Sequence, residues 1–211
     1  MKDGTDTVKR RYDRVSRFYD LFESLMEKIF FSKWRTMALS DLKGKVLEVG
    51  VGTGKNLKYY PKDVDLTGID ISSKMLAKAK KKREKIGIGA DLKLMDAQNM
   101  EFDDGTFNYV VVTFVLCSVP DPPKALQEIR RVLKENGELM ALEHVLSKNL
   151  IIALWERIHN PITVRLFGFN VDRDTRSNIE RSGFKVITDK ELAAGDVFRL
   201  FKCRVPIRKR S

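Results

Sequence analysis

The chain has 211 residues, of which 43% are hydrophobic and 33% charged, so it is long enough to bury a sizeable core as one domain. The net charge of +11 reflects either solvated helix faces and a basic tail or an anionic partner, a phospholipid surface or nucleic acid. The two cysteines, Cys117 and Cys203, lack metal-ligand spacing and are too few for a disulfide-rich secreted scaffold. The chain also has no bilayer-spanning apolar run and no apolar signal-peptide core near its start, so we expect a reduced, cytoplasmic setting.

The first predicted element is a long amphipathic helix from about Thr7 to about Leu39. Apolar side chains recur at intervals of three and four between Val8 and Ile29, with basic residues between them. Two interpretations are open. The helix packs on its own domain, or it forms a lid over a ligand site and also meets a membrane interface, since basic residues flank a face that carries Phe and Trp.

A buried strand and a glycine turn follow this helix. Val46–Val49 is the short apolar run typical of a strand covered on both faces. Gly50, Gly52 and Gly54 then come at alternate positions, where glycine permits positive φ and lets a ligand lie against bare backbone. The spacing differs from that of dinucleotide and phosphate-binding loops, and Asn56 stands where a phosphate loop carries its magnesium-binding Ser or Thr.

Two further strands lead to acidic residues. A helix is predicted from Lys55, and the strand Asp65–Ile69 then delivers Asp70 to the sheet edge, where a carboxylate can bind ribose hydroxyls. Ser72 is the predicted N-cap of a helix that continues to Lys85. The next strand, 91–95, runs into an acidic loop at 96–98.

The remaining elements complete an α/β pattern with one irregular segment. We predict a strand at Tyr109–Phe114, a helix at Pro123–Val132 stopped by Asn136-Gly137, a strand at Glu138–Glu143, and last strands at Gly183–Thr188 and Val197–Val205. Between them, the segment 150–169 is too apolar for an ordinary loop and too broken by polar residues and proline to span a bilayer. Three interpretations are open: this segment lines an acceptor channel, it dips into lipid, or it forms a buried helical hairpin of the core.

The order of glycine turn, acidic strand end, acid-Ala loop and apolar fourth strand resembles the class I S-adenosylmethionine (SAM) methyltransferases, over roughly Lys43 to Lys148. The resemblance implies a Rossmann-like α/β fold: a seven-stranded, mostly parallel sheet with one antiparallel strand, helices on both faces and an N-terminal helical lid. It also implies SAM as cofactor, S-adenosylhomocysteine as product and no metal. The cofactor-binding residues it implies are Tyr19, Glu48, Gly50, Gly52, Gly54, Asn56, Asp70, Ile71, Met75, Asp96, Ala97, Gln98 and Phe114.

Three acids carry most of this implied site. Glu48 matches the acid that orients the methionine amino group, Asp70 matches the ribose ligand, and Asp96 belongs to the loop at the adenine amino group. Two of these acids, Glu48 and Asp96, also have a purely structural interpretation. Glu48 is otherwise a strand-end carboxylate satisfied by backbone N–H groups, and Asp96 is otherwise an Asx-type cap.

The stretches LEVGVGTG, KNLKYYP, LCSV and EHV, with the apolar insertion, look most like small bacterial phosphatidylethanolamine N-methyltransferases and microsomal thiol methyltransferases. The pairs Tyr12-Asp13 and Tyr19-Asp20 resemble those of quinone and phospholipid methyltransferases, so Tyr19 is expected to touch the methionine end or the substrate. The apolar anchor of the microsomal members is not seen, which favours a soluble or peripheral protein.

His144 and Tyr19 are the expected catalytic residues. An ammonium or thiol acceptor must lose a proton before methylation, and His144 is the better placed of two histidines to act as base. Its alternative is a histidine that only hydrogen-bonds a neighbour. Tyr19 or Trp155 could stabilise a methylated ammonium through cation–π contact, and His159 could bind a phosphate headgroup.

The leading hypothesis is a SAM-dependent methyltransferase acting on an amphiphilic acceptor at a membrane surface, peripheral on its inner face. Phosphatidylethanolamine is favoured, then a lipophilic thiol or a quinone precursor. The other hypotheses are an RNA or protein methyltransferase and a non-catalytic SAM-binding protein; nucleic acid is less favoured because the basic block at 74–85 lacks interleaved aromatics. One domain is expected, with a lid at 1–42, a cofactor core at 43–148, an insertion at 149–171 and final strands at 172–211. Acceptor identity, number of methylations and oligomeric state stay open.

Overall fold

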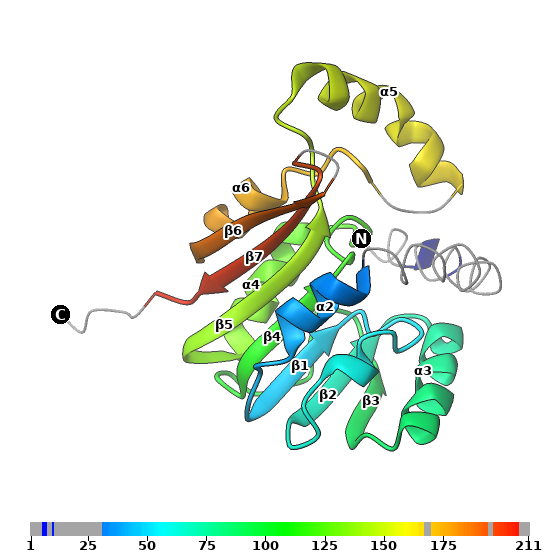
Figure 1. Cartoon of the computed structure of the whole chain (residues 1–211), viewed down its shortest axis with the longest axis vertical. Coiled ribbons are helices and arrows are strands. Elements are labelled where there is room, and N and C mark those ends of the chain that lie inside the picture. Colours follow the sequence, from blue (N-terminus) through cyan, green and yellow to red (C-terminus); the bar gives the residue numbers. More distant parts are fainter. Residues whose placement is uncertain (1–5, 8–9, 11–30, 167–169, 194–195, 207–211) are drawn as a thin grey trace.

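A computed structural model describes residues 6–7, 10, 31–166, 170–193 and 196–206 (Figure 1). Most of the predicted N-terminal helix, with Tyr12 and Tyr19, lies outside the described residues. Its described end is α2 (Ser32–Leu39).

Within the described residues, seven strands form one sheet in the order β3-β2-β1-β4-β5-β7-β6. Their bounds are β1 Lys45–Val49, β2 Asp65–Asp70, β3 Ala90–Leu94, β4 Phe107–Thr113, β5 Leu133–His144, β6 Lys185–Ala193 and β7 Phe198–Arg204. Neighbouring strands among β1 to β5 pair in parallel, whereas β7 is antiparallel to both β5 and β6. The predicted mostly parallel sheet with one antiparallel strand is confirmed.

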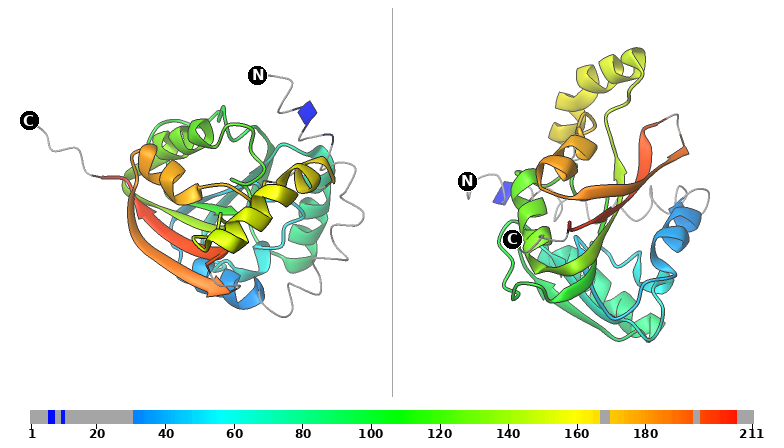
Figure 2. Two further views of the ribbon diagram at one scale, coloured as in Figure 1. Left: turned by 90° about the horizontal axis from the view of Figure 1, so that it is seen from above. Right: turned by 90° about the vertical axis from the view of Figure 1, so that its left-hand side faces the viewer.

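Helices cover both faces of this sheet (Figure 2). They are α2, the 3-10 turn η2 (Leu57–Tyr59), α3 (Ser73–Ile86), α4 (Pro122–Val132) and α6 (Thr175–Arg181), whereas α5 (Leu150–Leu166) stands away from the sheet beyond the end of β5 (Figure 1). Successive residues of a strand face opposite sides, so Leu47 and Val49 pack in the same core as α4, while Val46 packs in the same core as α2 and α3. Position 48 therefore faces the α2 side of the sheet.

Two helix starts follow from capping chemistry. The side chain of Ser72 accepts a hydrogen bond from Met75 N at 3.2 Å, which confirms the predicted N-cap of α3. The side chain of Asp121 accepts from Lys124 N at 3.0 Å and starts α4. Both helices thus begin directly after segments that leave the carboxyl edge of the sheet.

Two predictions about where helices begin and end were wrong. No α-helix starts at Lys55; the chain makes only the short turn η2, because Tyr60 is extended (ψ 144°) before Pro61, and a residue before proline disfavours the helical region. Asn136-Gly137 does not stop a helix, since α4 already ends at Val132. Asn136 instead adopts a φ of +63° within an irregular start of β5.

Over residues 150–166, the part of the apolar insertion that the structure describes, the chain forms the single helix α5 and not a buried hairpin. Several of its large apolar side chains are exposed, as described below. No helix in the described part of the chain is both long and apolar enough to cross a membrane.

A substitution at Gly54 would test how far the stability of the glycine turn depends on close packing. Its φ is +75°, and an added Cβ would lie 2.8 Å from Leu57 Cδ1 and 3.1 Å from Ala79 Cα. Gly54→Ala should therefore lower the free energy of unfolding by about 2–4 kcal/mol, through left-handed strain and overpacking together. Gly87→Ala is the matched control: its φ is +73°, but no heavy atom of the described structure lies within 4 Å, so only about 1 kcal/mol should be lost. Urea unfolding measures both, and equal losses would contradict the packing argument.

Candidate functional site

A cavity of about 140 Å³ opens at the carboxyl edge of β1, β2 and β4. This edge is where parallel α/β sheets bind ligands. The predicted residues that line it are Glu48, Gly50, Gly52, Asn56, Asp70, Ile71, Met75, Asp96, Ala97, Gln98 and Phe114. Gly54 lies outside the lining and packs against Leu57 and Ala79. Tyr19 lies outside the described residues.

The glycine turn is tied to the end of β2 by Asp70. Its Oδ2 accepts a hydrogen bond from Gly52 N and its Oδ1 accepts one from Ser72 N, both at 2.8 Å. Gly50 has a φ of +71°, and an added Cβ there would meet Val115 Cγ2 at 2.5 Å, so only glycine lets the two loops approach. Each carboxylate oxygen has a second lone pair, which leaves Asp70 able to accept from ligand hydroxyls.

Glu48 sits in a buried polar cluster built from four elements of the chain. Asn56 donates from Nδ2 to Glu48 Oε1 at 2.8 Å and to Thr113 Oγ1 at 2.6 Å, and Arg35 Nη1 donates to Asn56 Oδ1 at 2.6 Å. Glu48 is 2% exposed, and its Oε2 has no hydrogen-bond partner among the described residues. The hydrogen bond to Glu48 Oε1 thus comes from an amide side chain and not from the backbone N–H groups of the alternative interpretation.

Burial raises the pKa of Glu48 to about 7, against the opposing effects of the Asn56 hydrogen bond, the nearby Tyr60 hydroxyl and the Arg35 charge. The Tyr60 hydroxyl is close enough to act on this pKa, although its geometry falls short of a hydrogen bond. A buried carboxylate with an unused oxygen at a cavity wall is suited to receive a cationic group.

The acidic loop after β3 forms its own local turn. Asp96 Oδ1 accepts from Gln98 N at 2.9 Å, and Gln98 Oε1 accepts from Asp121 N at 3.2 Å. The Asx-type geometry of the alternative interpretation is therefore present, and the same residues also line the cavity.

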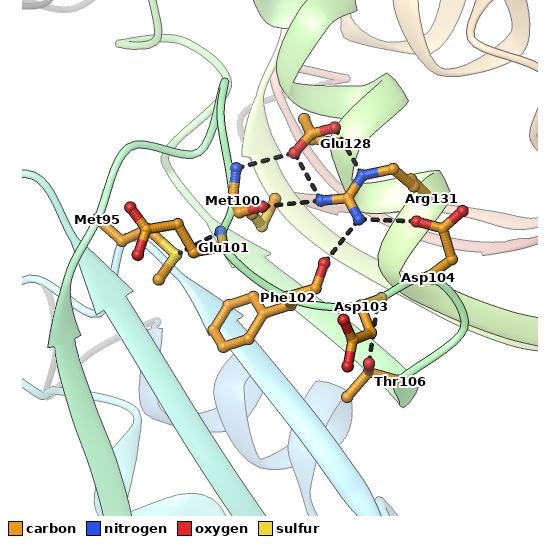
Figure 3. Close-up of polar contacts among 9 residues, drawn as sticks. All are labelled: Met95, Met100, Glu101, Phe102, Asp103, Asp104, Thr106, Glu128 and Arg131. Carbon is orange, nitrogen blue, oxygen red and sulfur yellow. Dashed lines mark hydrogen bonds and ion pairs between the residues drawn. The ribbon is translucent and has the colours of Figure 1, made fainter.

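Arg131 on α4 holds the segment that continues from this loop (Figure 3). Its guanidinium donates to the carbonyl oxygens of Met100 and Phe102 at 2.8 and 2.6 Å, and pairs with Glu128 and Asp104, each at 2.8 Å. Glu128 Oε2 in turn accepts from Met100 N at 2.8 Å. The loop is thereby fixed to α4 through backbone groups that its own turn leaves unpaired.

An aromatic cluster borders the cavity. Phe114 lines it with a φ of +57°, a rare conformation for a bulky residue and one that marks functional sites. Its ring centroid lies 5.1 Å from that of Phe31 and 6.1 Å from that of Phe198, and Trp34 packs on both of these rings. The guanidinium carbon of Arg35 lies 5.8 Å from the Phe114 centroid.

His144 is near the cavity but does not line it. Its ring contacts Phe198 edge-on at 5.4 Å, and its Nε2 lies 3.7 Å from Glu156 Oε1 on α5. Burial lowers the pKa of His144 to about 4, so the imidazole is neutral near pH 7.

Sequence reasoning missed Arg35 and Glu143. Arg35 gave no signal, because it lies in a helix separated from the cofactor motifs. Glu143 is fully buried, and its Oε1 accepts from Val115 N at 2.8 Å and Leu116 N at 3.1 Å, so it holds the loop after β4. A charged residue inside an apolar strand was the available signal for Glu143.

Comparisons with known proteins agree with this geometry. A family profile described as a methyltransferase domain matches residues 47–141. The phosphatidylethanolamine N-methyltransferase of Cereibacter sphaeroides is 39% identical over 142 residues, covering 66% of this chain and 68% of that protein. A thiol S-methyltransferase of Rattus norvegicus is 31% identical over 183 residues, covering 82% and 72%. A ubiquinone/menaquinone biosynthesis C-methyltransferase of Rickettsia typhi is 28% identical over 221 residues, covering 90% and 89%.

Solved structures share the fold at low identity. A putative methyltransferase from Bacillus halodurans superposes with a TM-score of 0.69 at 20% identity, covering 82% of this chain and 98% of that one. A SAM-dependent methyltransferase from Methanosarcina mazei gives 0.64 at 22% identity, covering 78% and 93%.

The raised pKa of Glu48 predicts how SAM binding depends on pH. As the pH falls through about 7, Glu48 takes up a proton and no longer attracts the amino group of the cofactor, so the Kd should rise by up to about tenfold per pH unit. Calorimetric titration between about pH 5.5 and about pH 7 avoids the titration of the cofactor's own amino group. Glu48→Gln should bind weakly with a flat profile, whereas Glu143→Gln, which alters a carboxyl of similar pKa outside the cavity lining, should keep the wild-type slope. A wild-type slope in Glu48→Gln would refute this assignment.

Asp70→Asn tests the ribose contact. Loss of the charged acceptor should weaken SAM binding by at least about tenfold, because a hydrogen bond to a charged group contributes roughly 1.5–3 kcal/mol. Asp65→Asn, at the exposed opposite end of β2, is the matched control and should bind as the wild type does. Equal affinities of the two variants would show that Asp70 only holds the turn.

Proposed function

This chain belongs to the class I SAM-dependent methyltransferases, and we propose that it methylates the amine of a phosphatidylethanolamine headgroup. The family and the cofactor follow from the comparisons above. The acceptor is our inference from the chemistry of the cavity wall and from one relative.

The cavity residues fit the cofactor group by group. When bound, SAM supplies a methyl group on a sulfonium sulfur, open to in-line displacement. The unpartnered oxygen of Glu48 suits the amino group, Asp70 suits the ribose hydroxyls, and the apolar side chains of Ile71 and Met75, with the loop 96–98, suit the adenine. No metal is needed for this reaction, so most of the rate depends on how the residues orient the acceptor and exclude water.

The observation that carries an amine acceptor is the aromatic ring of Phe114 at the cavity wall, on a residue whose backbone φ is +57°. Aromatic faces attract ammonium groups, and the attraction grows as methyl groups make the cation harder to hydrate. Phe31 and Phe198 pack against this ring, and Trp34 packs on both of them. The relative from Cereibacter sphaeroides, named as a phosphatidylethanolamine N-methyltransferase, supports the same acceptor.

We propose His144 as the base that takes the ammonium proton before transfer. The imidazole is neutral and has a free lone pair, but the burial that lowers its pKa to about 4 also makes it a weak base. Proton uptake would therefore depend on a negative charge on Glu156, 3.7 Å from Nε2, which stabilises the protonated ring. Phe198 contacts both His144 and Phe114, so the acceptor amine would have to approach along this pair of rings. The expected role of Tyr19 stays a proposal, because it lies outside the described residues.

A lipophilic thiol is the second candidate acceptor, favoured by Arg35. This guanidinium is 4% exposed, lines the cavity and lies over the Phe114 ring, where its charge would favour a thiolate. The thiol S-methyltransferase of Rattus norvegicus, 31% identical, supports this alternative.

Transfer of labelled methyl groups from SAM decides between these acceptors. We expect label in phosphatidylethanolamine vesicles, and little in an alkyl thiol or in bulk RNA offered separately. Phe114→Leu should lower kcat/KM for the lipid by about fivefold or more, because it removes the aromatic face but keeps an apolar side chain. Phe102→Leu, which alters a ring packed edge-on against Phe107 and outside the cavity lining, is the control.

The other outcomes each count against the lipid amine. Label in the thiol alone would transfer the assignment to the second candidate. Label in RNA alone would assign the basic surface to nucleic acid, and bound SAM with no label would leave a binding protein without turnover.

A further inference from the structure

The helix α5 carries an apolar face that the protein leaves exposed. Its side chains at 150, 151, 154, 155 and 158 fall on one side of a helix that turns 100° per residue. Their exposed fractions are 85% for Leu150, 80% for Ile151, 60% for Leu154, 60% for Trp155 and 61% for Ile158. The other exposed large apolar side chains of the described residues, Met37, Ile86, Leu94 and Ile187, are 36–54% exposed and belong to different elements. Contiguous exposed apolar surface of this kind marks an interaction site.

The opposite face of α5 is attached to the protein, which fixes the direction of the apolar face. Ala153 and Glu156 are buried, and Glu156 Oε2 accepts from Ser147 N at 2.9 Å. Farther along, Asn160 Oδ1 accepts from Val171 N at 2.9 Å. Figure 1 and the right-hand view of Figure 2 show α5 standing away from the sheet, beyond the end of β5.

The exposed charges of residues 148–166 are all positive, although the Asp196 carboxylate accepts a hydrogen bond from Lys148 N at 2.6 Å just before the helix. Lys148, Arg157 and Arg165 are exposed, whereas Glu156, the only acid between 148 and 166, is buried. A helix with an apolar face, a tryptophan and basic residues at its margins is suited to lie in the headgroup layer of an anionic bilayer. The net charge of +11 on the chain adds a long-range attraction between the protein and an anionic bilayer.

The segment after α5 is bonded to the wall of the cofactor cavity. Asn170 donates from its backbone N at 2.9 Å and from Nδ2 at 3.0 Å to the carbonyl oxygen of Cys117, and Arg173 donates to that of Val119 at 3.3 Å. The loop that contains these carbonyls lines the cavity through Val115 and Val119. A surface that holds α5 would therefore hold the cavity close to it.

We propose that α5 is the membrane-docking element of this protein, with its exposed apolar side chains inserted at the surface of an anionic phospholipid bilayer. This deepens the proposed function, because it names the surface from which a lipid acceptor enters the cavity. Docking itself requires no methyl transfer, so the two proposals can fail separately.

The tryptophans of the chain report on this docking directly. There are two: Trp155 is 60% exposed on α5, and Trp34 is 6% exposed in the aromatic cluster. When the full chain is mixed with vesicles of phosphatidylcholine plus phosphatidylglycerol, the emission of Trp155 should shift to shorter wavelength and become protected from acrylamide. Vesicles of phosphatidylcholine alone should bind more weakly, because they lack the anionic charge.

Two matched double variants distinguish vesicle binding through α5 from nonspecific binding through other exposed apolar side chains. Ile151→Ser with Leu154→Ser should lower the partition coefficient by at least about tenfold, because two large apolar side chains are lost from the inserted face. Leu94→Ser with Ile187→Ser, on β3 and β6 with exposures of 54% and 46%, should leave it unchanged. Unaltered SAM affinity in both double variants shows that they fold.

Three results would overturn the docking proposal. One is an unshifted emission with no co-flotation on anionic vesicles, and another is equal loss of binding in both double variants. The third is a protein that forms dimers without lipid and loses them in the α5 variant, which would make this face an interface between copies. Vesicle binding without label in phosphatidylethanolamine would sustain the docking and count against the acceptor.

Discussion

The carboxylate of Glu48, buried at the end of β1, is the constraint around which the site is organised. It connects β1 to Asn56 after the glycine turn, and through Asn56 to Arg35 on α2 and Thr113 on β4. A carboxylate without full pairing is costly to bury. With a pKa of about 7 in the folded protein and 4.5 as its ordinary value, the stability it contributes is complete below about pH 4.5 and is lost as the pH rises through 7, on the order of 3 kcal/mol. A cationic group bound beside Oε2 would offset this loss. Burial of the Glu48 carboxylate therefore lowers the stability of the free protein and raises its affinity for a cationic ligand.

Two other strand-end carboxylates organise the loops around that cluster. Asp70 ends β2 and receives the N–H groups of Gly52 and Ser72, while Glu143 near the end of β5 receives those of Val115 and Leu116. Parallel strands bring their carboxyl ends to one edge, where the outgoing loops expose unpaired backbone donors. The half-buried Asp70 and the buried Glu143 satisfy those donors and hold the walls of the cavity in place.

The site and the exposed helix share a physical logic. A headgroup amine must leave water to meet the methyl group, and aromatic faces such as Phe114 can replace part of its hydration. Asn160 of α5 is bonded to Val171, and Asn170 beside it is bonded to the cavity wall, so this apolar helix would shorten the path of such an acceptor from lipid to site. The same cavity could serve a thiol without that helix, which is why the acceptor and the docking surface are separate proposals.

Local sequence patterns were enough to predict most of the fold and the cofactor edge. Short apolar runs specify β1 and β4, alternate glycines specify a turn that needs positive φ at Gly50, and Ser72 specifies a helix start, because each signal acts between residues close in the chain. The same patterns predicted that Glu48, Asp70 and the loop 96–98 belong to one site, and all of them line the cavity.

Long-range packing decided the rest. Nothing local indicates that Arg35 reaches Asn56, that Phe114 adopts a left-handed backbone against the rings of Phe31 and Phe198, or that His144 lies beyond the cavity lining. The apolar composition of α5 was visible in the sequence, but its exposed face was not. Which side of a helix is buried depends on the partners that the tertiary structure supplies, here Ser147 and Val171.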